Sequence, residues 1–286
     1  MKKTTASFPN LLLLAAPFLF SQCTYHAYFQ SPFYGNSEPY HAIPLQSDSL
    51  KSATYVSGAF TIGGVNQSLR DDVYSFNGSF HRSHNFGNFQ GFYGANFAVG
   101  SYTASEYGFY QYDRPVGVGD SLPPNLKPGS RFFGGYGAGG GIDYVLPFGR
   151  GSEWRVVGLS FTVQKEFGGY RNFRKAMPDS LADVIFRNDL TGVLGVSTEF
   201  AFKGRHATIG YKLMLAGDIL NTKKNYGGYN NDLYGTIFFQ QTLSLTRHRI
   251  TGFVQFNVGD RLFIAHSGIN CRLGGRERNS ARRYDP

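Results

Sequence analysis

The stretch DDVYSFNGSFHRSH, residues 71–84, alternates between two kinds of side chain. One set of alternate positions is mainly aromatic and consists of Tyr74, Phe76, Gly78 and Phe80. The positions between them are small and uncharged or weakly basic and consist of Ser75, Asn77, Ser79 and His81. A period of two is typical of a β-strand, because a helix would scatter these aromatics among the serines. A soluble sheet would carry Lys and Glu on its polar face, so this pattern indicates a strand with aromatics towards lipid and small polar groups towards a narrow lumen.

The composition of the 286-residue chain favours the same interpretation. Charged residues make up 16% of it, against roughly 25% in soluble domains, whereas glycine (37 residues) and aromatic residues (16%) are abundant. The mean hydropathy is −0.27. After the N-terminus, no stretch approaches the roughly 20 apolar residues that a spanning helix needs. These properties are typical of a membrane β-barrel.

Nine further segments alternate in the same way, so we predict an all-β fold. With residues 71–84, the segments are 53–62, 89–103, 131–146, 154–167, 191–202, 206–215, 233–245, 249–258 and 261–273. Each is long enough to cross a bilayer at a tilt. The sequence therefore predicts an antiparallel up-and-down transmembrane β-barrel of about ten strands over residues 51–273. The glycines at 135, 137, 139 and 141 fall on its lumen face, where they leave room for larger side chains opposite.

The predicted connections alternate between short and long. Short periplasmic turns and longer outer loops are typical of bacterial outer-membrane barrels, and an even strand number places both ends of the barrel in the periplasm. Within the long loop 168–189, we predict a short helix over Asp179–Arg187.

The first 22 residues have the features of an export signal. Lys2 and Lys3 precede a short apolar stretch over residues 11–20, so we predict a signal peptide over residues 1–22. The stretch ends in Leu19-Phe20-Ser21-Gln22-Cys23, which resembles the lipobox of bacterial lipoproteins, although Gln22 stands where that family has Gly, Ala or Ser. The resemblance implies cleavage before Cys23 and its modification with lipid, including palmitate.

The cysteines leave a second possibility open. If the signal is cleaved without lipidation near Ser21, Cys23 is a thiol that could pair with Cys271, the other cysteine, in an oxidising compartment.

The two segments that flank the predicted barrel are irregular. Residues 23–50 contain three prolines and no clear period, and we predict an extended periplasmic tether. Its many aromatic residues lead us to expect that part of it packs against the barrel or a partner. Residues 274–286 form a basic C-terminal tail. The net charge of +9 is otherwise dispersed, so we expect no nucleic-acid partner.

Charged and ionisable residues recur on the predicted lumen face. They are His81, Asp143, Glu166, Glu199 and Lys212, and Arg272 shares their face. Because burying one charge alone is costly, we expect a polar network that fills the lumen, with Lys212 paired to Glu199 on the neighbouring strand.

One cluster, His81-Arg82-Ser83-His84, raises the question of catalysis. Small barrels that modify lipid A use His and Ser near the outer leaflet. However, His81 and His84 point to opposite faces of a strand and precede a predicted periplasmic turn. We therefore predict no catalytic, cofactor or metal site.

The whole pattern resembles small outer-membrane β-barrel proteins of Gram-negative bacteria, and the lipoprotein-type signal makes it similar to barrel lipoproteins of the Bacteroidota. The resemblance implies a location in the cell outer membrane, an N-terminus lipid-anchored at Cys23, contact with outer-membrane lipids, and a protein partner in the envelope. We expect a structural or partner-binding role in a cell-envelope assembly. The alternatives are a lipid-tethered soluble lipocalin-like binding barrel, whose apolar face would point inward, and an outer-membrane lipid-modifying enzyme.

Overall fold

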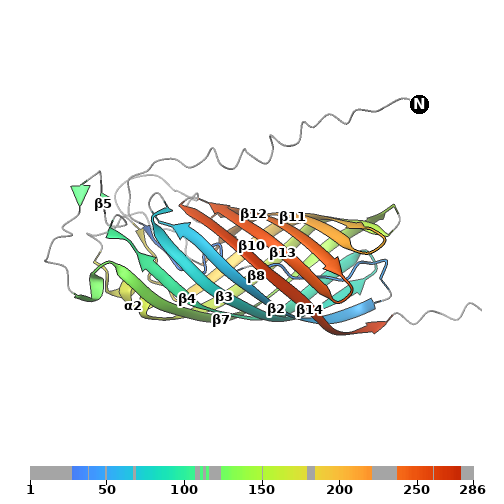
Figure 1. Ribbon diagram of the computed structural model, residues 1–286, viewed down its shortest axis with the longest axis horizontal. Helices are drawn as coiled ribbons and strands as arrows, with labels where there is room; N and C mark the ends of the chain where they lie inside the picture. The colour runs from blue at the N-terminus through green and yellow to red at the C-terminus, as the bar shows by residue number, and fades with distance from the viewer. Residues whose placement is uncertain are drawn as a thin grey trace, which may run out of the picture.

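Ten long strands close into one antiparallel barrel (Figure 1). The computed structural model describes residues 28–37, 39–48, 50–66, 69–106, 110–111, 114–115, 124–149, 151–178, 184–220, 237–259 and 261–277. Within these residues each barrel strand pairs with the strands before and after it along the chain, and the last, β14, closes the ring against the first, β2. The predicted all-β, up-and-down barrel of ten strands is confirmed.

The barrel strands are β2 (Leu50–Val65), β3 (Asp71–Phe86), β4 (Phe89–Ala104), β7 (Gly129–Phe148), β8 (Ser152–Gly168), β10 (Leu190–Lys203), β11 (Thr208–Asp218), β12 (Ile237–Arg247), β13 (Ile250–Gly259) and β14 (Leu262–Glu277). We call one end of the barrel the short-turn end, because the connections 87–88, 149–151, 204–207 and 248–249 lie there. The connections 105–128, 169–189 and 219–236 define the opposite, long-loop end.

The two faces of the wall differ as the alternation predicts. On β3, Tyr74, Phe76 and Phe80 are 46%, 48% and 55% exposed on the outside, whereas Ser75 and Asn77 are buried inside. The other strands also expose large apolar side chains outwards. An apolar exterior around a polar interior suits lipid outside and is the arrangement of outer-membrane β-barrels. A lipocalin-like carrier would need the reverse arrangement, so that alternative is wrong.

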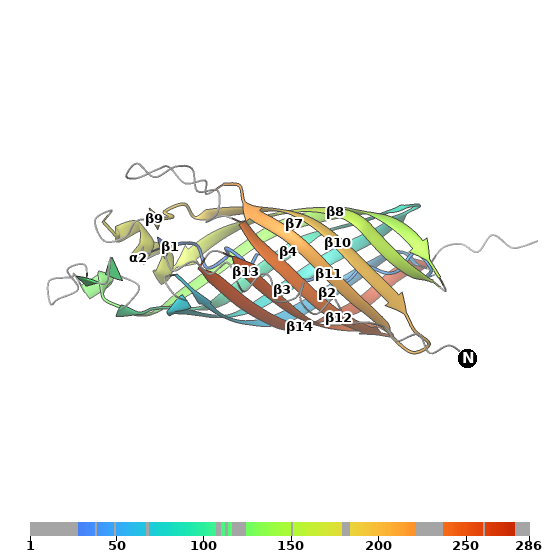
Figure 2. The same cartoon turned by 90° about the horizontal axis from the view of Figure 1, so that it is seen from above.

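Smaller elements gather at the long-loop end, where Figure 2 shows α2, β1 and β9 together. They are β1 (Tyr28–Phe29), β5 (Tyr110–Gln111), β6 (Arg114–Pro115), η4 (Pro124–Leu126), α2 (Gly169–Ala176) and β9 (Val184–Ile185). β1 pairs with β9, and β5 with β6. None of the helices in the described part of the chain is long and apolar enough to cross a membrane.

The helix expected over Asp179–Arg187 forms earlier in the same loop, at Gly169–Ala176. The described part of the expected stretch holds β9 instead, and residues 179–183 lie outside the described residues. Gly168, with φ of 115°, adopts a backbone conformation that other residues rarely take. This glycine lets the chain turn directly from β8 into α2.

The segment that precedes the first barrel strand lies inside the barrel. Residues 28–37 and 39–48, which we call the lumen segment, run through the inside of the barrel from the long-loop end to the short-turn end (Figure 1, blue). Phe29 packs edge-on against Phe173 of α2 at one end, with ring centroids 5.6 Å apart. The Ser47 hydroxyl donates to the Gly151 carbonyl at the other end, at 2.9 Å.

The described residues of the stretch predicted as an extended periplasmic tether lie within the lumen, and residues 32–36 form turns there. Its aromatic side chains are buried there, and inward-facing polar side chains of the wall bind its backbone. Burial of apolar area together with satisfied backbone groups accounts for this position.

Candidate functional site

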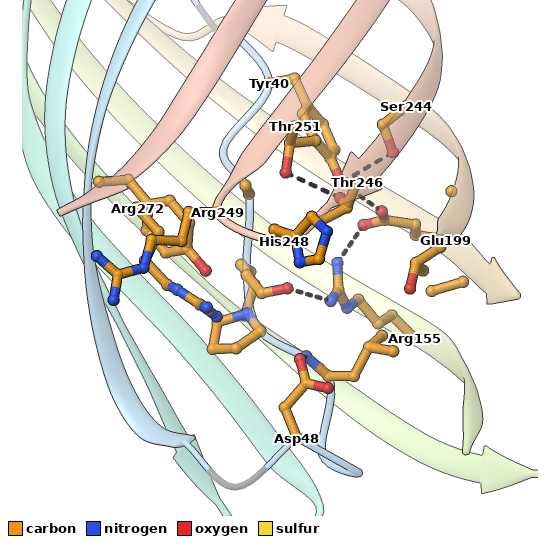
Figure 3. Close-up of a pocket in the computed structure, with 18 residues that line it drawn as sticks. Tyr40, Asp48, Arg155, Glu199, Ser244, Thr246, His248, Arg249, Thr251 and Arg272 are labelled. Carbon is orange, nitrogen blue, oxygen red and sulfur yellow. Dashed lines mark hydrogen bonds and ion pairs between the residues drawn. The ribbon is translucent and has the colours of Figure 1, made fainter. Parts of the chain in front are cut away.

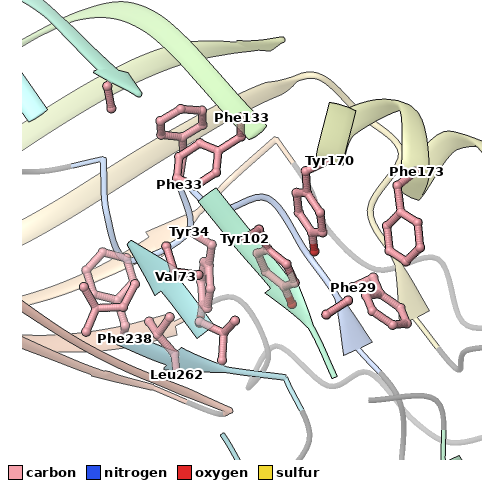
Figure 4. Close-up of a cluster of buried hydrophobic side chains, with 14 of the residues drawn as sticks. Phe29, Phe33, Tyr34, Val73, Tyr102, Phe133, Tyr170, Phe173, Phe238 and Leu262 are labelled. Carbon is pink, nitrogen blue, oxygen red and sulfur yellow. The ribbon is translucent and has the colours of Figure 1, made fainter. Parts of the chain in front are cut away.

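The lumen segment meets the wall in three successive layers, and the first is apolar. At the long-loop end, a buried cluster surrounds Phe29, Phe33 and Tyr34 of the segment (Figure 4). The Phe33 ring packs edge-on against Phe133, and Tyr34 against Phe238, each with centroids 5.6 Å apart. This layer closes the long-loop end of the lumen with side chains of the chain itself.

One glycine makes room for this packing. A Cβ at position 135 would lie 2.3 Å from the ring of Phe33, closer than real Cβ atoms approach. We predicted that the inward glycines of this strand leave space for larger side chains opposite, and this holds at Gly135. The side chain that uses the space is Phe33 of the lumen segment.

Tyr170 of α2 completes the apolar layer. Its ring stacks on Tyr102 with centroids 3.7 Å apart, and its hydroxyl donates to the Gln30 carbonyl at 3.1 Å. Burial raises the pKa of the Tyr170 phenol, so the hydroxyl keeps its proton for this bond. On the outer side of α2, the Arg171 side chain donates to Asp189 at 2.6 Å, and this hydrogen bond lowers the pKa of the Asp189 carboxyl.

The middle layer is an amide and hydroxyl network centred on Asn36. Its side-chain NH₂ donates to the Ser75 hydroxyl at 3.1 Å, and its oxygen accepts from the Asn77 amide at 2.8 Å. Thr61 donates to the same oxygen at 3.3 Å and lies 2.8 Å from the Nδ1 of His266. The polar face of the stretch 71–84 thus binds the lumen segment directly.

The third layer is ionic and centres on Arg155 of β8, which is 2% exposed (Figure 3). Its guanidinium donates to Glu199 at 2.6 Å and to Glu153 at 2.9 Å. It also donates to the carbonyl of Ile43 in the lumen segment at 3.1 Å. The hydroxyl of Tyr40, also in the lumen segment, donates to Glu199 at 2.9 Å. Two carboxylates of the wall and one carbonyl of the segment thereby share one buried cation, and Tyr40 joins this network through Glu199.

Arg155 was not among the predicted lumen residues, and a β-bulge explains why. Strict alternation gives Arg155 the same face as Val157, which points outwards and is 46% exposed. On β7, Tyr144 pairs with Val157 and the next residue pairs with Arg155, so Val156 has no partner. The register with β10 shifts at the same place, between Gly158 and Arg155. The extra residue turns Glu153 and Arg155 inwards. A run of charged residues at the start of an otherwise apolar face is the one sequence signal of this shift.

Glu166 belongs to a second buried ion pair, nearer the long-loop end. Its carboxylate accepts from Arg174 of α2, and both side chains are at most 1% exposed. The hydroxyl of Ser31 in the lumen segment donates to the same carboxylate at 2.8 Å. The segment is therefore bound near each of its ends by a buried ion pair between an arginine and a wall carboxylate.

Glu199 and Lys212 face each other across β10 and β11, as the expected pairing requires. The ion-pair partner of Glu199 is nevertheless Arg155. Asp143 also faces the lumen and is 7% exposed. Among the residues that the structure describes, neither Asp143 nor Lys212 forms an ion pair.

His81 is fully buried in the lumen and lies against the segment. Its Nε2 is 3.1 Å from the Ala42 carbonyl, which can only accept, so this nitrogen carries the proton. Its ring stacks on Tyr55 and meets the ring of His41 edge-on, with centroids 5.0 and 4.7 Å apart. His84 lies on the outer face, where it stacks on Tyr93. The described residues contain no group of three His, Cys, Asp or Glu that could hold a metal ion.

A small polar cavity of about 50 Å³ remains near the short-turn end, between the lumen segment and the wall (Figure 3). Tyr40, Arg155 and Glu199 line its inner part, and Arg249 and Arg272 line its rim. It has room for a few water molecules. It is far smaller than the aqueous channel of a porin.

Comparison with known proteins adds distant structural similarities. No family model and no curated protein matches the sequence. The translocator domain of the autotransporter NalP from Neisseria meningitidis is 9% identical, with 80% of this chain and 90% of that one covered and a TM-score of 0.40. The transport unit of the autotransporter AIDA-I from Escherichia coli is 7% identical (81% and 92% covered, TM-score 0.38), and the NanC porin 11% (77% and 98%, TM-score 0.35).

The class of protein follows from the chain's own geometry. Its closed antiparallel ring, apolar exterior and polar interior define a β-barrel of the outer-membrane type. Within that class, its lumen is filled by the segment that precedes the first barrel strand.

Proposed function

We propose that this protein is an outer-membrane β-barrel lipoprotein with a structural or partner-binding role in a cell-envelope assembly. The observation that carries the proposal is the filled lumen. A diffusion channel needs an open aqueous path, whereas here Arg155, Glu166 and Asn36 join wall and segment through buried polar contacts. The two ends and the outer wall are then the surfaces on which the barrel acts.

The environment of His81 supports a non-enzymatic role. Its imidazole is 0% exposed and covered by His41 and Tyr55, so it has no path to a lipid substrate. Ser83 is equally buried and donates to the Ala53 carbonyl. We propose that neither residue is catalytic, and that lipid A is unchanged in cells expressing the protein.

The course of the lumen segment bears on the lipid anchor at Cys23. The chain enters the lumen at the long-loop end, where Phe29 is buried against α2. Residues 23–28 reach about 17 Å when fully extended. We propose that the acyl chains on Cys23 insert into the leaflet at the long-loop end, which in the outer membrane is the outer leaflet.

Three measurements test these proposals. Cys23→Ser should abolish palmitate labelling, and unchanged labelling would contradict the proposed lipid anchor. Unboiled SDS gels should show heat-modifiable migration of a membrane-fraction protein, and release by carbonate would contradict the location. Planar-bilayer recordings of the purified full-length protein should show no steady conductance. A stable open current of porin size would contradict the proposed assembly role and indicate a transport function.

A matched pair of epitope insertions tests which end of the barrel faces the cell exterior. An epitope inserted directly before Tyr28 should bind antibody on intact cells, whereas the same epitope in the turn 149–151 should bind only after the outer membrane is permeabilised. The reverse pattern would contradict the proposed orientation.

A further inference from the structure

The short-turn end carries a group of basic side chains, which we call the basic crescent. It consists of Lys51, Arg82, Arg205, Arg247, Arg249 and Arg272. In the closed ring, the elements that bear them follow one another from the β10–β11 turn through β12, β13, β14 and β2 to β3. On the remaining sector, β4, β7 and β8, the described residues at this end include no exposed basic side chain.

Among the described residues, acidic side chains do not balance this charge. Of the described carboxylates at this end, Asp48 pairs with Lys203 at 2.9 Å, and Glu153 and Glu199 are buried with Arg155. None of the six side chains of the crescent forms an ion pair with another described residue. The crescent is therefore a concentrated positive surface on a chain whose remaining charges are dispersed.

Two arginines of the crescent lie on the outer face near the short-turn end. Arg82 lies between Phe80 and Phe86 on the outer face of β3, and Arg247 follows Leu245 as the last residue of β12. Phe80, Phe86 and Leu245 are 55%, 59% and 54% exposed, so both arginines lie beside lipid-facing side chains. Each guanidinium can extend towards the lipid headgroups with its methylene stem along apolar surface.

Two further arginines meet at the mouth of the small cavity. The backbone N–H of Arg272 donates to the Arg249 carbonyl at 2.7 Å, which brings the two residues together. Both line the cavity beside the hydroxyls of Thr246 and Thr251 (Figure 3). Guanidinium and hydroxyl donors side by side suit the oxygens of a phosphate group.

We propose that the basic crescent binds the phosphate groups of anionic phospholipids in the leaflet at the short-turn end. The position of Arg82 and Arg247 beside lipid-facing side chains favours lipid over a soluble partner. Within the described residues the exposed basic side chains of this end lie along β10 to β3, so we expect such lipids to gather there. The leaflet's identity rests on the proposed outer-membrane location, whereas the binding itself can be measured on the purified protein.

The test is a lipid titration of the full-length protein in non-ionic detergent, read by native mass spectrometry with phosphatidylglycerol and phosphatidylcholine as probes. The wild type should prefer phosphatidylglycerol. The triple variant Arg82→Gln, Arg247→Gln, Arg249→Gln should bind it at least tenfold more weakly, since one basic residue contributes about fivefold near an anionic surface. The control Arg70→Gln, Lys127→Gln, Lys175→Gln removes the same charge from exposed positions at the long-loop end that lie outside the barrel strands, and should stay within twofold of the wild type.

Equal phosphatidylglycerol binding by the crescent variant and the wild type would overturn the proposal. Full competition by millimolar inorganic phosphate would also overturn it, because the site would then bind free phosphate and not a headgroup. Heat-modifiable migration of every variant shows that the barrel is folded, so failure of lipid binding is distinguishable from failure of the proposed outer-membrane role.

Discussion

Arg155 on β8 and Glu199 on β10 form an ion pair of 2.6 Å in which the side chains are 2% and 6% exposed. The same guanidinium holds Glu153 and the carbonyl of Ile43. A buried charge is tolerated only when its partners are present, so this arrangement couples the stability of the wall to the position of the lumen segment.

Arg155→Met should destabilise the barrel by about 3–5 kcal/mol, because it leaves two buried carboxylates without their cation. The urea midpoint can be followed by the fluorescence of Trp154, the single tryptophan. Lys203→Met is the control, since its pair with Asp48 is about one-third exposed and should contribute less than about 1 kcal/mol. Adding Glu153→Gln and Glu199→Gln to Arg155→Met should restore part of the loss. An unchanged midpoint for Arg155→Met would contradict the coupling.

Deletion of Val156 should be tolerated, because it removes the extra residue of the bulge. Arg155 is then next to the outward Val157, so strict alternation keeps Arg155 and Glu153 on the inner face. We expect a heat-modifiable folded band for this deletion, as for Val156→Ala. Deletion of Val156 and Val157 together should give none, because Arg155 is then next to the inward Gly158 and turns towards lipid, which leaves Glu199 without its cation. A folded double-deletion variant of wild-type stability would contradict this prediction.

Gly135→Val should displace the lumen segment, because its side chain would occupy the space of the Phe33 ring. Overpacking of this kind costs about 1–3 kcal/mol. The matched control is Gly252→Val, since nothing lies within 4 Å of a Cβ at that position. Combining Gly135→Val with Phe33→Ala should recover stability relative to the sum of the two single changes, and simple additivity would argue against the contact.

Cys23 and Cys271 should not form an intramolecular disulfide. Leu262 shares the apolar cluster of Phe29 at the long-loop end, and β14 from Leu262 to Cys271 spans about 30 Å at about 3.3 Å per residue. Residues 23–29 reach only about 20 Å when extended. Maleimide labelling after denaturation should therefore modify Cys271 equally with and without prior reduction. A gel shift that depends on reductant and disappears in Cys271→Ser would refute this prediction.

The wall of the barrel could be predicted from the sequence because its signal is local. Tyr74 and Ser75 already show which face meets lipid and which meets the lumen, and the same period recurs in every strand. His81, Asp143, Glu166, Glu199 and Lys212 all fall on the predicted inner face. Their partners could not be predicted in the same way, because a pairing such as Glu166 with Arg174 depends on how a loop folds back over the barrel.

Two features escaped prediction for definite physical reasons. The inward position of Arg155 depends on one extra residue, and a one-residue shift reverses every face after it. The course of residues 28–48 depends on contacts with most of the strands, such as those of Asn36 with Ser75 and of Tyr40 with Glu199. An irregular stretch rich in aromatics has no period that records such long-range contacts.

The lumen segment also constrains the order in which the molecule can be assembled. It precedes β2, and the ring is complete only when β14, the last strand, pairs with β2. Phe33 and Tyr34 are held tightly on all sides, so threading them through a ring that has already closed would require reopening its hydrogen bonds. We infer that the strands close around a segment already in place, so the N-terminal part of the chain serves as an internal template for the wall.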